Sequence, residues 1–225
     1  MWNTPGSNVN ITGVSICKGH VAVANKLAVS SGLSHKITHH HLNATKVDTL
    51  KDAPFSGAYS CEVLAEIPDD GLRACFAALH DILPSGAEFS YADIVSAEDP
   101  PTSRGGPKRR PNPPRGFLNR LLSLIAPLVV TMAAGDEWRP VSRFNSLLSQ
   151  AGFEVLSVES IGDRVFVPTW EYAQKRMQKQ PDMGTNSSLF TVWMFRFLTK
   201  AHLGGLASLW ESGQIDYVLV KARRV

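Results

Sequence analysis

The sequence has few cysteines, no long uninterrupted apolar segment and no leader-like N-terminus, and each absence excludes a class of protein. Its three cysteines, Cys17, Cys61 and Cys75, show no paired spacing, so we expect buried, reduced thiols instead of a disulfide framework. The longest apolar run, Phe117–Gly135, is broken by polar residues and a proline and falls short of the roughly 20 residues that span a bilayer. The first ten residues have neither a basic nor an apolar leader region, so no signal peptide is expected. These absences predict a cytoplasmic protein.

Acidic residues are absent between Pro100 and Gly135, where six of the 23 basic residues lie. The net charge of +3 therefore comes from this segment, because the rest of the chain carries 17 basic and 20 acidic residues. Prolines and glycines in Asp99–Gly116 predict a long loop that acts as a lid or a binding segment. The basic cluster lacks interleaved aromatics and a nucleic-acid-binding motif, which argues against nucleic acid as a partner. A buried cap helix after this loop is the default, and contact of residues 104–132 with an anionic membrane surface is the alternative.

A strand, a helix and a second strand are predicted between Phe55 and Val95. Phe55–Cys61 is small, aromatic and uncharged, as expected of a strand buried on both faces. Asp69 and Asp70 follow Pro68 and are expected to cap the helix. Its apolar face recurs at helical spacing and the helix stops at Ser85-Gly86; that face is formed by Leu72, Phe76, Leu79 and Leu83. Phe89–Val95 is the second strand, so the unit predicts parallel pairing through a right-handed crossover.

Further strands and helices on both sides of this unit predict an α/β sheet with a helical cap. The predicted strands are Asn8–Cys17, His35–Leu42, Phe153–Ser160 and Gln214–Ala222. The predicted helices are Lys18–Ser31, Phe117–Ala134, one that follows Asp136 and ends at Gly152, Thr169–Lys179 and Ser187–Glu211. Val47–Ala53 is predicted to be a short helical or irregular piece. Residues 1–99, 136–160 and 214–225 would form the core, residues 100–135 the basic loop and apolar helix, and residues 161–213 the cap. Ligands bind outside the carboxyl ends of strands in such sheets, which points to Cys61–Glu66 and Asp93–Ala97.

Three adjacent histidines are the only candidate metal cluster that we find in the sequence. His39, His40 and His41 alternate between the faces of a strand, so only the first and third share one. No Cys, Asp or Glu stands near them at metal-ligand spacing, and we predict no metal site. His80 is a candidate general base, but it falls on the far side of the apolar helix face and is expected at the surface.

Several segments taken together resemble a known family. They read ITGVSICKGHVAVAN, HHLNA, FSGAYSCEVLAEIPD, LHDILPSGAEFSYADIV, LLSQAGFEVLSVESI and IDYVLVKARR, in this order along the chain. Their order, spacing and turn residues resemble the class I S-adenosylmethionine-dependent methyltransferases, in particular the small-molecule enzymes of the cyclopropane-synthase, sterol and quinone kind. The resemblance implies a Rossmann-like fold, S-adenosylmethionine as cofactor and a small acceptor molecule as partner.

The resemblance places the cofactor beside the first two predicted strands. Ser15 stands where the family has an acidic residue that holds the ribose, and a hydroxyl can make one such hydrogen bond without the charge. Asn43, with Ala44 next to it, stands where the family has an aspartate that accepts from the adenine amino group. Cys17 and His20 replace the Ser and Gln with which the family opens the next helix. Ser15, His20, Asn43 and Ala44 are thus the predicted cofactor-binding residues.

The family's first strand and its glycine-rich loop have no counterpart before Asn8, where only one glycine, Gly6, occurs. In the family's strand order, 3-2-1-4-5-7-6, that strand is central. We therefore expect an N-terminally incomplete, Rossmann-like sheet that lacks its first strand and leaves two strands without a partner between them. The affinity for the cofactor should be severely reduced. A dimer in which another chain supplies the strand is an alternative.

On the acceptor side the resemblance points to the fourth and fifth strands of the family and to the cap. Glu62 keeps the first residue of the family's Glu-x-Leu-Glu-His pattern, whose Glu-His pair is lost here. With Asp93, Trp138 and Tyr172 it makes up the predicted substrate-side residues, and no residue is predicted to be an obligatory base. The function implied is methyl transfer to a small apolar molecule. The alternative is a non-catalytic, methyltransferase-like interaction or regulatory protein.

Overall fold

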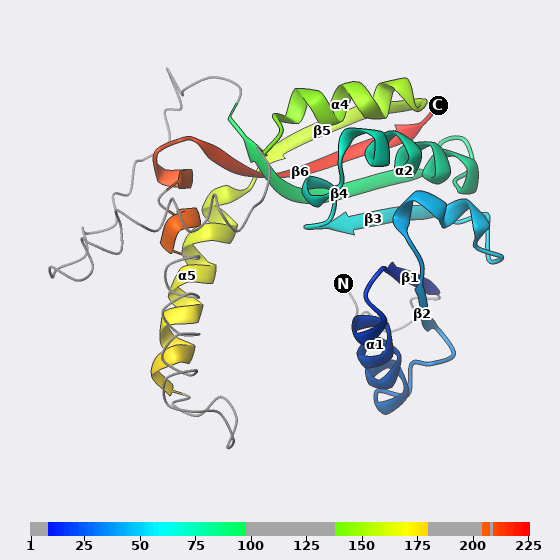
Figure 1. Cartoon of the computed structure of the whole chain (residues 1–225), viewed down its shortest axis with the longest axis horizontal. Helices are drawn as coiled ribbons and strands as arrows, with labels where there is room; N and C mark the ends of the chain where they lie inside the picture. Colours follow the sequence, from blue (N-terminus) through cyan, green and yellow to red (C-terminus); the bar gives the residue numbers. More distant parts are fainter. Residues whose placement is uncertain (1–8, 98–137, 180–203, 208) are drawn as a thin grey trace, which may run out of the picture.

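The computed structural model of the 225-residue chain describes residues 9–97, 138–179, 204–207 and 209–225, and these residues build two separate sheets. The smaller has the order β1-β2 and the larger the order β3-β4-β6-β5. In Figure 1 β1 lies between β2 and β3, and helices α2 and α4 lie on one side of the larger sheet. The strands are β1 (Ile11–Ser15), β2 (Ile37–His41), β3 (Gly57–Cys61), β4 (Glu88–Ser96), β5 (Phe153–Ser160) and β6 (Ile215–Arg224).

The predicted strand–helix–strand unit is confirmed in the larger sheet. Helix α2 (Asp69–Ile82) connects β3 and β4, which pair in parallel from Gly57 opposite Glu88 to Cys61 opposite Ala92. Strand β6 then runs antiparallel between β4 and β5, with a register shift between Val155 and Ser157. The final strand, β6, thus lies between β4 and β5 and not at the edge of the sheet.

The main hydrophobic core lies between this sheet and the helices α2 and α4 (Val141–Gln150). All four residues of the predicted α2 face are buried in it. Aromatic rings from β4 and α4 interlock there, with Tyr91 against Phe144 at 5.7 Å between ring centres. Gly86 and Gly152 turn the chain out of the two helices at φ values of 84° and 85°, which only glycine adopts without strain. The helical spacing of the apolar residues of α2 therefore predicts its buried face correctly.

The smaller sheet is a β1-α1-β2 unit whose strands are parallel. Helix α1 (Lys18–Ser30) ends as predicted at Gly32 (φ 69°), where the N–H groups of Gly32 and Leu33 donate to carbonyls of the last helical turn. Asn25 of α1 bonds both backbone groups of His39, at 2.9 and 3.0 Å, which satisfies the outer edge of β2. The 3₁₀ segment η1 (Ala44–Thr49) leads back to the larger sheet and packs against α2.

The two sheets together confirm the expected strand order with its central position open. Placed side by side they read β2-β1, a gap, then β3-β4-β6-β5, and no strand among the described residues joins β1 to β3. The prediction that Phe55–Cys61 is buried on both faces is wrong. Tyr59 is 65% exposed and Cys61 is exposed, because β3 forms an edge of its sheet instead of an inner strand.

Other local expectations need correction. Only Cys75 is buried, whereas Cys17, which follows β1, and Cys61, the last residue of β3, are exposed. The cap of α2 is Pro68, because Asp69 and Asp70 lie inside the first turn. His80 is half-buried, since its ring packs edge-on against Phe153.

The segments predicted as loop, apolar helix and second cap helix fall largely outside the described residues. This applies to residues 98–137 and 180–203. The predicted Thr169–Lys179 helix is the end of a longer helix, α5 (Gly162–Lys179), which contains Pro168. In the part of the chain that the structure describes, no helix is long and apolar enough to cross a membrane.

Candidate functional site

The turn that follows β3 has an unusual backbone conformation at Glu62. Its φ of 52° lies in the left-handed region, which a residue with a Cβ rarely adopts without cost. The Glu62 N–H still donates to Ala92 O of β4 at 2.9 Å, so the strand pairing continues up to this residue. The conformation turns the chain out of the sheet and leaves the Glu62 side chain exposed at the strand end.

The side chain of Asp93, on β4, binds the backbone of this turn. Its side chain is only 2% exposed, and one carboxylate oxygen accepts from the N–H groups of Leu64 and Ala65 at 2.9 and 3.1 Å. Burial raises the pKa of Asp93, although these backbone donors oppose the shift. Asp93 was predicted to lie on the substrate side, and one of its carboxylate oxygens binds the backbone of the turn. It acts as a structural anchor for the segment that carries Glu62.

Tyr217, on the last strand β6, forms a hydrogen bond with the side chain of Glu62. Tyr217 Oη donates to Glu62 Oε1 at 2.9 Å and lies 3.8 Å from the Sγ of Cys61. Burial, and then the hydrogen bond to Glu62, raise the pKa of Tyr217, so this hydroxyl stays protonated and remains a donor. The pKa of Tyr59 is also raised, first by burial and then by Cys61 and Glu62. We call Tyr59, Cys61, Glu62 and Tyr217 the Glu62 group.

An aromatic cluster adjoins the Glu62 group on the sheet face opposite to α2. Phe166 of α5 packs edge-on against Tyr217 at 6.0 Å between ring centres, and its ring lies tilted against that of Trp210 at 5.9 Å. Of the two aromatic residues predicted on the substrate side, Trp138 packs on the same cluster, whereas Tyr172 is 60% exposed on α5. The carboxylate of Glu62 therefore lies next to this apolar cluster, to which its partner Tyr217 belongs.

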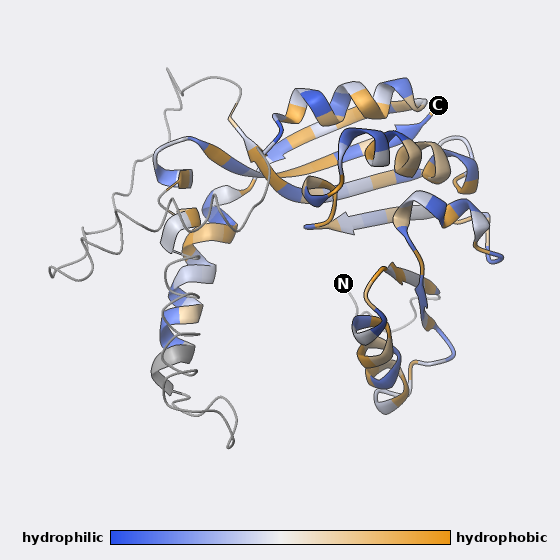
Figure 2. Ribbon diagram, in the orientation of Figure 1, coloured by the Kyte–Doolittle hydropathy of each residue, from blue (hydrophilic) through white to orange (hydrophobic). Residues whose placement is uncertain are grey.

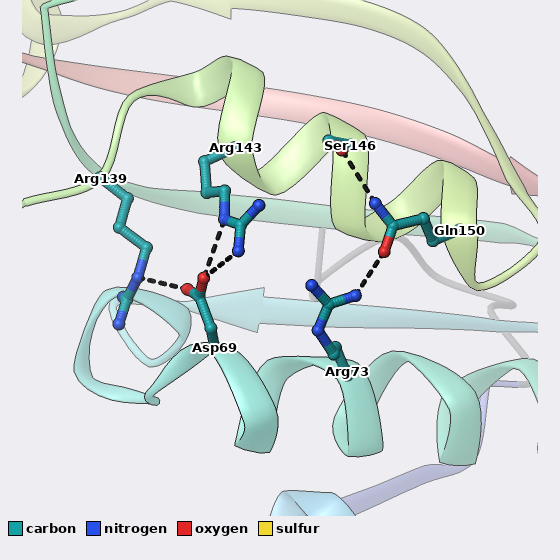
Figure 3. A network of polar contacts seen from close by, with 6 residues as sticks. All are labelled: Asp69, Arg73, Arg139, Arg143, Ser146 and Gln150. Carbon is teal, nitrogen blue, oxygen red and sulfur yellow. Dashed lines mark hydrogen bonds and ion pairs between the residues drawn. The ribbon is translucent and has the colours of Figure 1, made fainter.

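Two arginines connect the far end of the Glu62 turn to α4 (Figure 3). Arg139 donates to Ala65 O at 3.2 Å and pairs with Asp69 at 2.8 Å. Arg143 binds the same Asp69 carboxylate through two nitrogens, and its Nε contact is 2.8 Å long. The hydrogen bond from Arg143 is the largest cause of a lowered pKa of Asp69. One turn further along, Arg73 of α2 contacts Gln150 of α4, which donates to Ser146 at 3.1 Å.

Removing the Asp69 charge should destabilise the protein in a pH-dependent way. Because the folded-state pKa is lowered, the contribution is complete above the unfolded pKa and is lost as the pH falls through the folded one. Asp69→Asn should cost about 1 kcal/mol at pH 6, allowing for solvent screening of a carboxylate that is one-third exposed. The difference should fade below about pH 4. Urea unfolding of Asp69→Asn and of the exposed Asp70→Asn, from pH 3 to 7, measures this; equal losses in the two variants would contradict it.

The predicted cofactor residues meet at the carboxyl ends of β1 and β2. Ser15 Oγ accepts from the N–H of Cys17 at 3.1 Å, and Asn43 Oδ1 accepts from the N–H of Thr45 at 3.0 Å. Each oxygen thus already makes one bond, while the Ser15 hydroxyl keeps its proton to donate. His20 is exposed in the first turn of α1, and Ala44 begins η1. These residues fit the polar end of a nucleoside, with hydrogen-bonding groups at adjacent strand ends.

The structure places the predicted cofactor-binding residues and the Glu62 group on different sheets. Ser15, His20, Asn43 and Ala44 lie on the smaller sheet, and Glu62 with its partners lies on the larger one. The sequence prediction missed Tyr217 and the two arginines. No local signal identifies them, because Tyr217 is 155 residues from Glu62 and both arginines are at least 70 residues from their partners.

A curated relative and several solved structures are similar to this chain. No family model matches the chain. The erythromycin 3''-O-methyltransferase of Saccharopolyspora erythraea is 24% identical over 228 residues, which cover 99% of this chain and 67% of that protein. The chain thus spans about two-thirds of the length of this curated relative.

Solved structures match in fold at low sequence identity. The cyclopropane synthase MmaA2 of Mycobacterium tuberculosis has a TM-score of 0.68 at 16% identity, over 97% of this chain and 71% of that one. Geranyl diphosphate C-methyltransferase from Streptomyces coelicolor, in complex with geranyl diphosphate and S-adenosyl-L-homocysteine, has a TM-score of 0.61 at 13% identity, over 96% and 65%. The [4+2]-cyclase SpnF has a TM-score of 0.62 at 17% identity, over 97% and 68%.

The fold is therefore the Rossmann-like fold of the class I S-adenosylmethionine-dependent methyltransferases, with the sheet divided at its central position. In both sequence and fold the chain resembles the small-molecule enzymes of that class, cyclopropane synthases among them. This confirms the family resemblance and the fold class expected from the sequence.

Proposed function

We propose that this protein serves in S-adenosylmethionine-dependent methyl transfer to a small, largely apolar molecule that carries a hydroxyl group. The observation that carries the proposal is the Glu62 carboxylate. It is exposed at a strand end, held in a left-handed backbone conformation and bonded to Tyr217. Unfavourable backbone conformations persist where the surrounding structure enforces them, and they cluster at functional sites.

The Glu62 group would bind and orient the acceptor. Tyr217 occupies one carboxylate oxygen of Glu62, so the other is directed to accept a hydrogen bond from the acceptor hydroxyl. Glu62 would take up the proton that the acceptor hydroxyl loses when its oxygen bonds to the methyl carbon and the bond from that carbon to the sulfonium sulfur of the donor breaks. The neighbouring cluster around Phe166 would bury the apolar body of the acceptor and exclude water. An oxygen acceptor agrees with the name of the Saccharopolyspora relative, an O-methyltransferase.

Ser15 and Asn43 would hold the ribose and adenine of the methyl donor, with His20 and Ala44 beside them. When bound, S-adenosylmethionine supplies an electrophilic methyl group. These residues would bind the polar nucleoside end of the methyl donor and position the donor toward the Glu62 group.

Titration calorimetry with S-adenosylmethionine tests this assignment. We expect saturable binding that falls at least about tenfold in the Ser15→Ala/Asn43→Ala double variant, since each lost hydrogen bond costs about 1 kcal/mol. Ser34→Ala, an exposed hydroxyl in the loop before β2, is the matched control and should bind as the unaltered protein does. Absence of saturable binding by a cooperatively folded protein would contradict the proposal.

A non-catalytic, methyltransferase-like interaction protein is the second candidate. The observation that favours it is the division of the sheet, which places the predicted cofactor-binding residues on β1-β2 and the Glu62 group on β3-β4-β6-β5. Cooperative unfolding without binding of S-adenosylmethionine is the result expected for this candidate.

A further inference from the structure

Residues 138–140 connect the aromatic cluster to the Glu62 turn. Their backbone is fixed at the end of β4, where the N–H of Ser96 donates to Arg139 O at 3.0 Å. The side chain of Trp138 packs on the aromatic cluster, whereas that of Arg139 reaches the Glu62 turn. Two neighbouring residues of one fixed segment therefore contact the two parts of the proposed acceptor site.

Arg139 holds the Glu62 turn at Ala65. The C=O of Ala65 accepts from Nη1 of Arg139 at 3.2 Å, and its N–H donates to Asp93 at 3.1 Å. Both backbone groups of Ala65 are thus bonded by side chains from other elements. The φ of 52° at Glu62 is unfavourable, and such a conformation persists only where the surrounding structure enforces it. Asp93 and Arg139 provide this restraint from two different segments.

The aromatic cluster reaches the Glu62 carboxylate by a second route, through Tyr217. Tyr217 belongs to the cluster, and its hydroxyl donates to Glu62 Oε1 at 2.9 Å. Figure 2 shows hydrophobic residues on β4 and β6 near the beginning of α5, where this cluster lies. Trp138 thus supports the side chain of Glu62 through the cluster, and Arg139 supports its backbone through Ala65.

Arg139 and Arg143 share one partner but differ in a second contact. Figure 3 shows both guanidinium groups at the carboxylate of Asp69, with Arg139 on one oxygen and Arg143 on the other. Arg139 donates in addition to Ala65 O, whereas the side-chain contacts described for Arg143 are all with Asp69. A planar guanidinium holds two partners in one fixed geometry. Asp69 therefore orients Arg139 against the turn, and Arg143 takes no direct part in holding it.

We propose that Arg139 is a positioning residue for Glu62, which keeps this carboxylate at a fixed place relative to Trp138 and the aromatic cluster. The inference rests on the proposed function, because it concerns the same acceptor site. Arg139 acts through the backbone of Ala65 and not by contact with the acceptor. An acceptor whose apolar body lies on the cluster would then present its hydroxyl to Glu62 at one distance. Misplacing a reacting group by about 1 Å can cost roughly 100-fold in rate.

Amide exchange in a matched pair of variants tests whether Arg139 holds the turn. Arg139→Met and Arg143→Met each remove one partner of Asp69 and keep an apolar stem, but only the first loses the bond to Ala65 O. Exchange at the Ala65 amide, read by ¹⁵N NMR, should be at least about tenfold faster in Arg139→Met than in Arg143→Met, as expected for the loss of a hydrogen bond from a charged donor. Exchange at Val220, buried in β6, reports global unfolding and is the reference for both variants.

Methyl transfer to geraniol separates positioning from stability in the same variants. Arg139→Met should lower kcat about tenfold at unchanged KM, because the aromatic cluster still binds the apolar body while Glu62 is displaced. Arg143→Met should keep both constants. Arg139→Lys keeps the positive charge beside Asp69 and should regain stability without regaining the full kcat, since an ammonium group lacks the planar fork that bonds two partners at once.

The exchange measurement requires no methyl transfer, so the two proposals can fail separately. If the unaltered protein transfers no methyl group, the proposed function fails. Faster exchange at Ala65 in Arg139→Met than in Arg143→Met would then still identify Arg139 as the residue that holds the turn. Equal exchange at this amide in the two variants would overturn the inference, and so would an equal kcat. If Arg139→Met does not fold, Arg139→Lys takes its place in both measurements.

Discussion

Glu62→Gln should lower methyl transfer by about 100-fold, because it removes the carboxylate that takes up the acceptor proton. Label transfer from S-adenosyl-[methyl-³H]methionine to apolar alcohols, with geraniol first, measures the rate. The amide keeps the shape of Glu62 and can still accept from Tyr217, whose hydroxyl lies 2.9 Å away. Binding of S-adenosylmethionine should stay unchanged, since the predicted cofactor residues lie on the other sheet.

Three further variants show whether Glu62 acts in the chemistry or only in the fold. Glu66→Gln, an exposed carboxylate four residues on, should transfer at the unaltered rate. Tyr217→Phe removes the hydroxyl that orients Glu62 and should lower the rate about tenfold, in keeping with one lost hydrogen bond. Glu62→Gly should abolish transfer while the free energy of unfolding stays within about 1 kcal/mol, because glycine adopts the φ of 52° without strain. Full activity in Glu62→Gln would refute the proposed role.

Asp93→Ala should destabilise the protein by about 3 kcal/mol, because it leaves the N–H groups of Leu64 and Ala65 without an acceptor in a buried position. For a chain of this length that lowers the midpoint of thermal unfolding by about 6–12 °C. The turn that carries Glu62 should loosen at the same time. Circular dichroism melting and amide exchange of Leu64 and Ala65 measure the two effects.

Asp93→Asn should lose less than Asp93→Ala. The amide oxygen still accepts one of the turn's N–H groups, and the neutral side chain avoids the desolvation that raises the pKa of Asp93. Asp81→Ala, at a carboxylate with a side chain that is 70% exposed, serves as the surface control and should shift the melting midpoint by no more than about 2 °C. Equal stability of Asp93→Ala and Asp81→Ala would mean that Asp93 does not anchor the turn.

Much of the fold could be predicted because it is encoded in local patterns. The α2 face repeats at helical spacing over one stretch of sequence, and its four apolar residues are all buried. Strand β5 has the predicted bounds, Phe153–Ser160. Gly32 and Gly86 stand at turns that require positive φ. The order of these elements, together with the family resemblance, was enough to place Ser15, Asn43 and Glu62 at strand ends.

The sequence by itself thus determined where the described strands and the helices α1, α2 and α4 lie along the chain and in which order they follow one another. Only the tertiary structure decided what surrounds each site residue. Tyr217 reaches Glu62 from a strand 155 residues away, and Asp93 serves the backbone of a turn almost 30 residues before it. Tyr59 and Cys61 are exposed because, among the residues that the structure describes, β3 has a neighbouring strand on one side only. Burial and hydrogen-bond partners belong to the assembled sheet, and no local pattern of residues contains them.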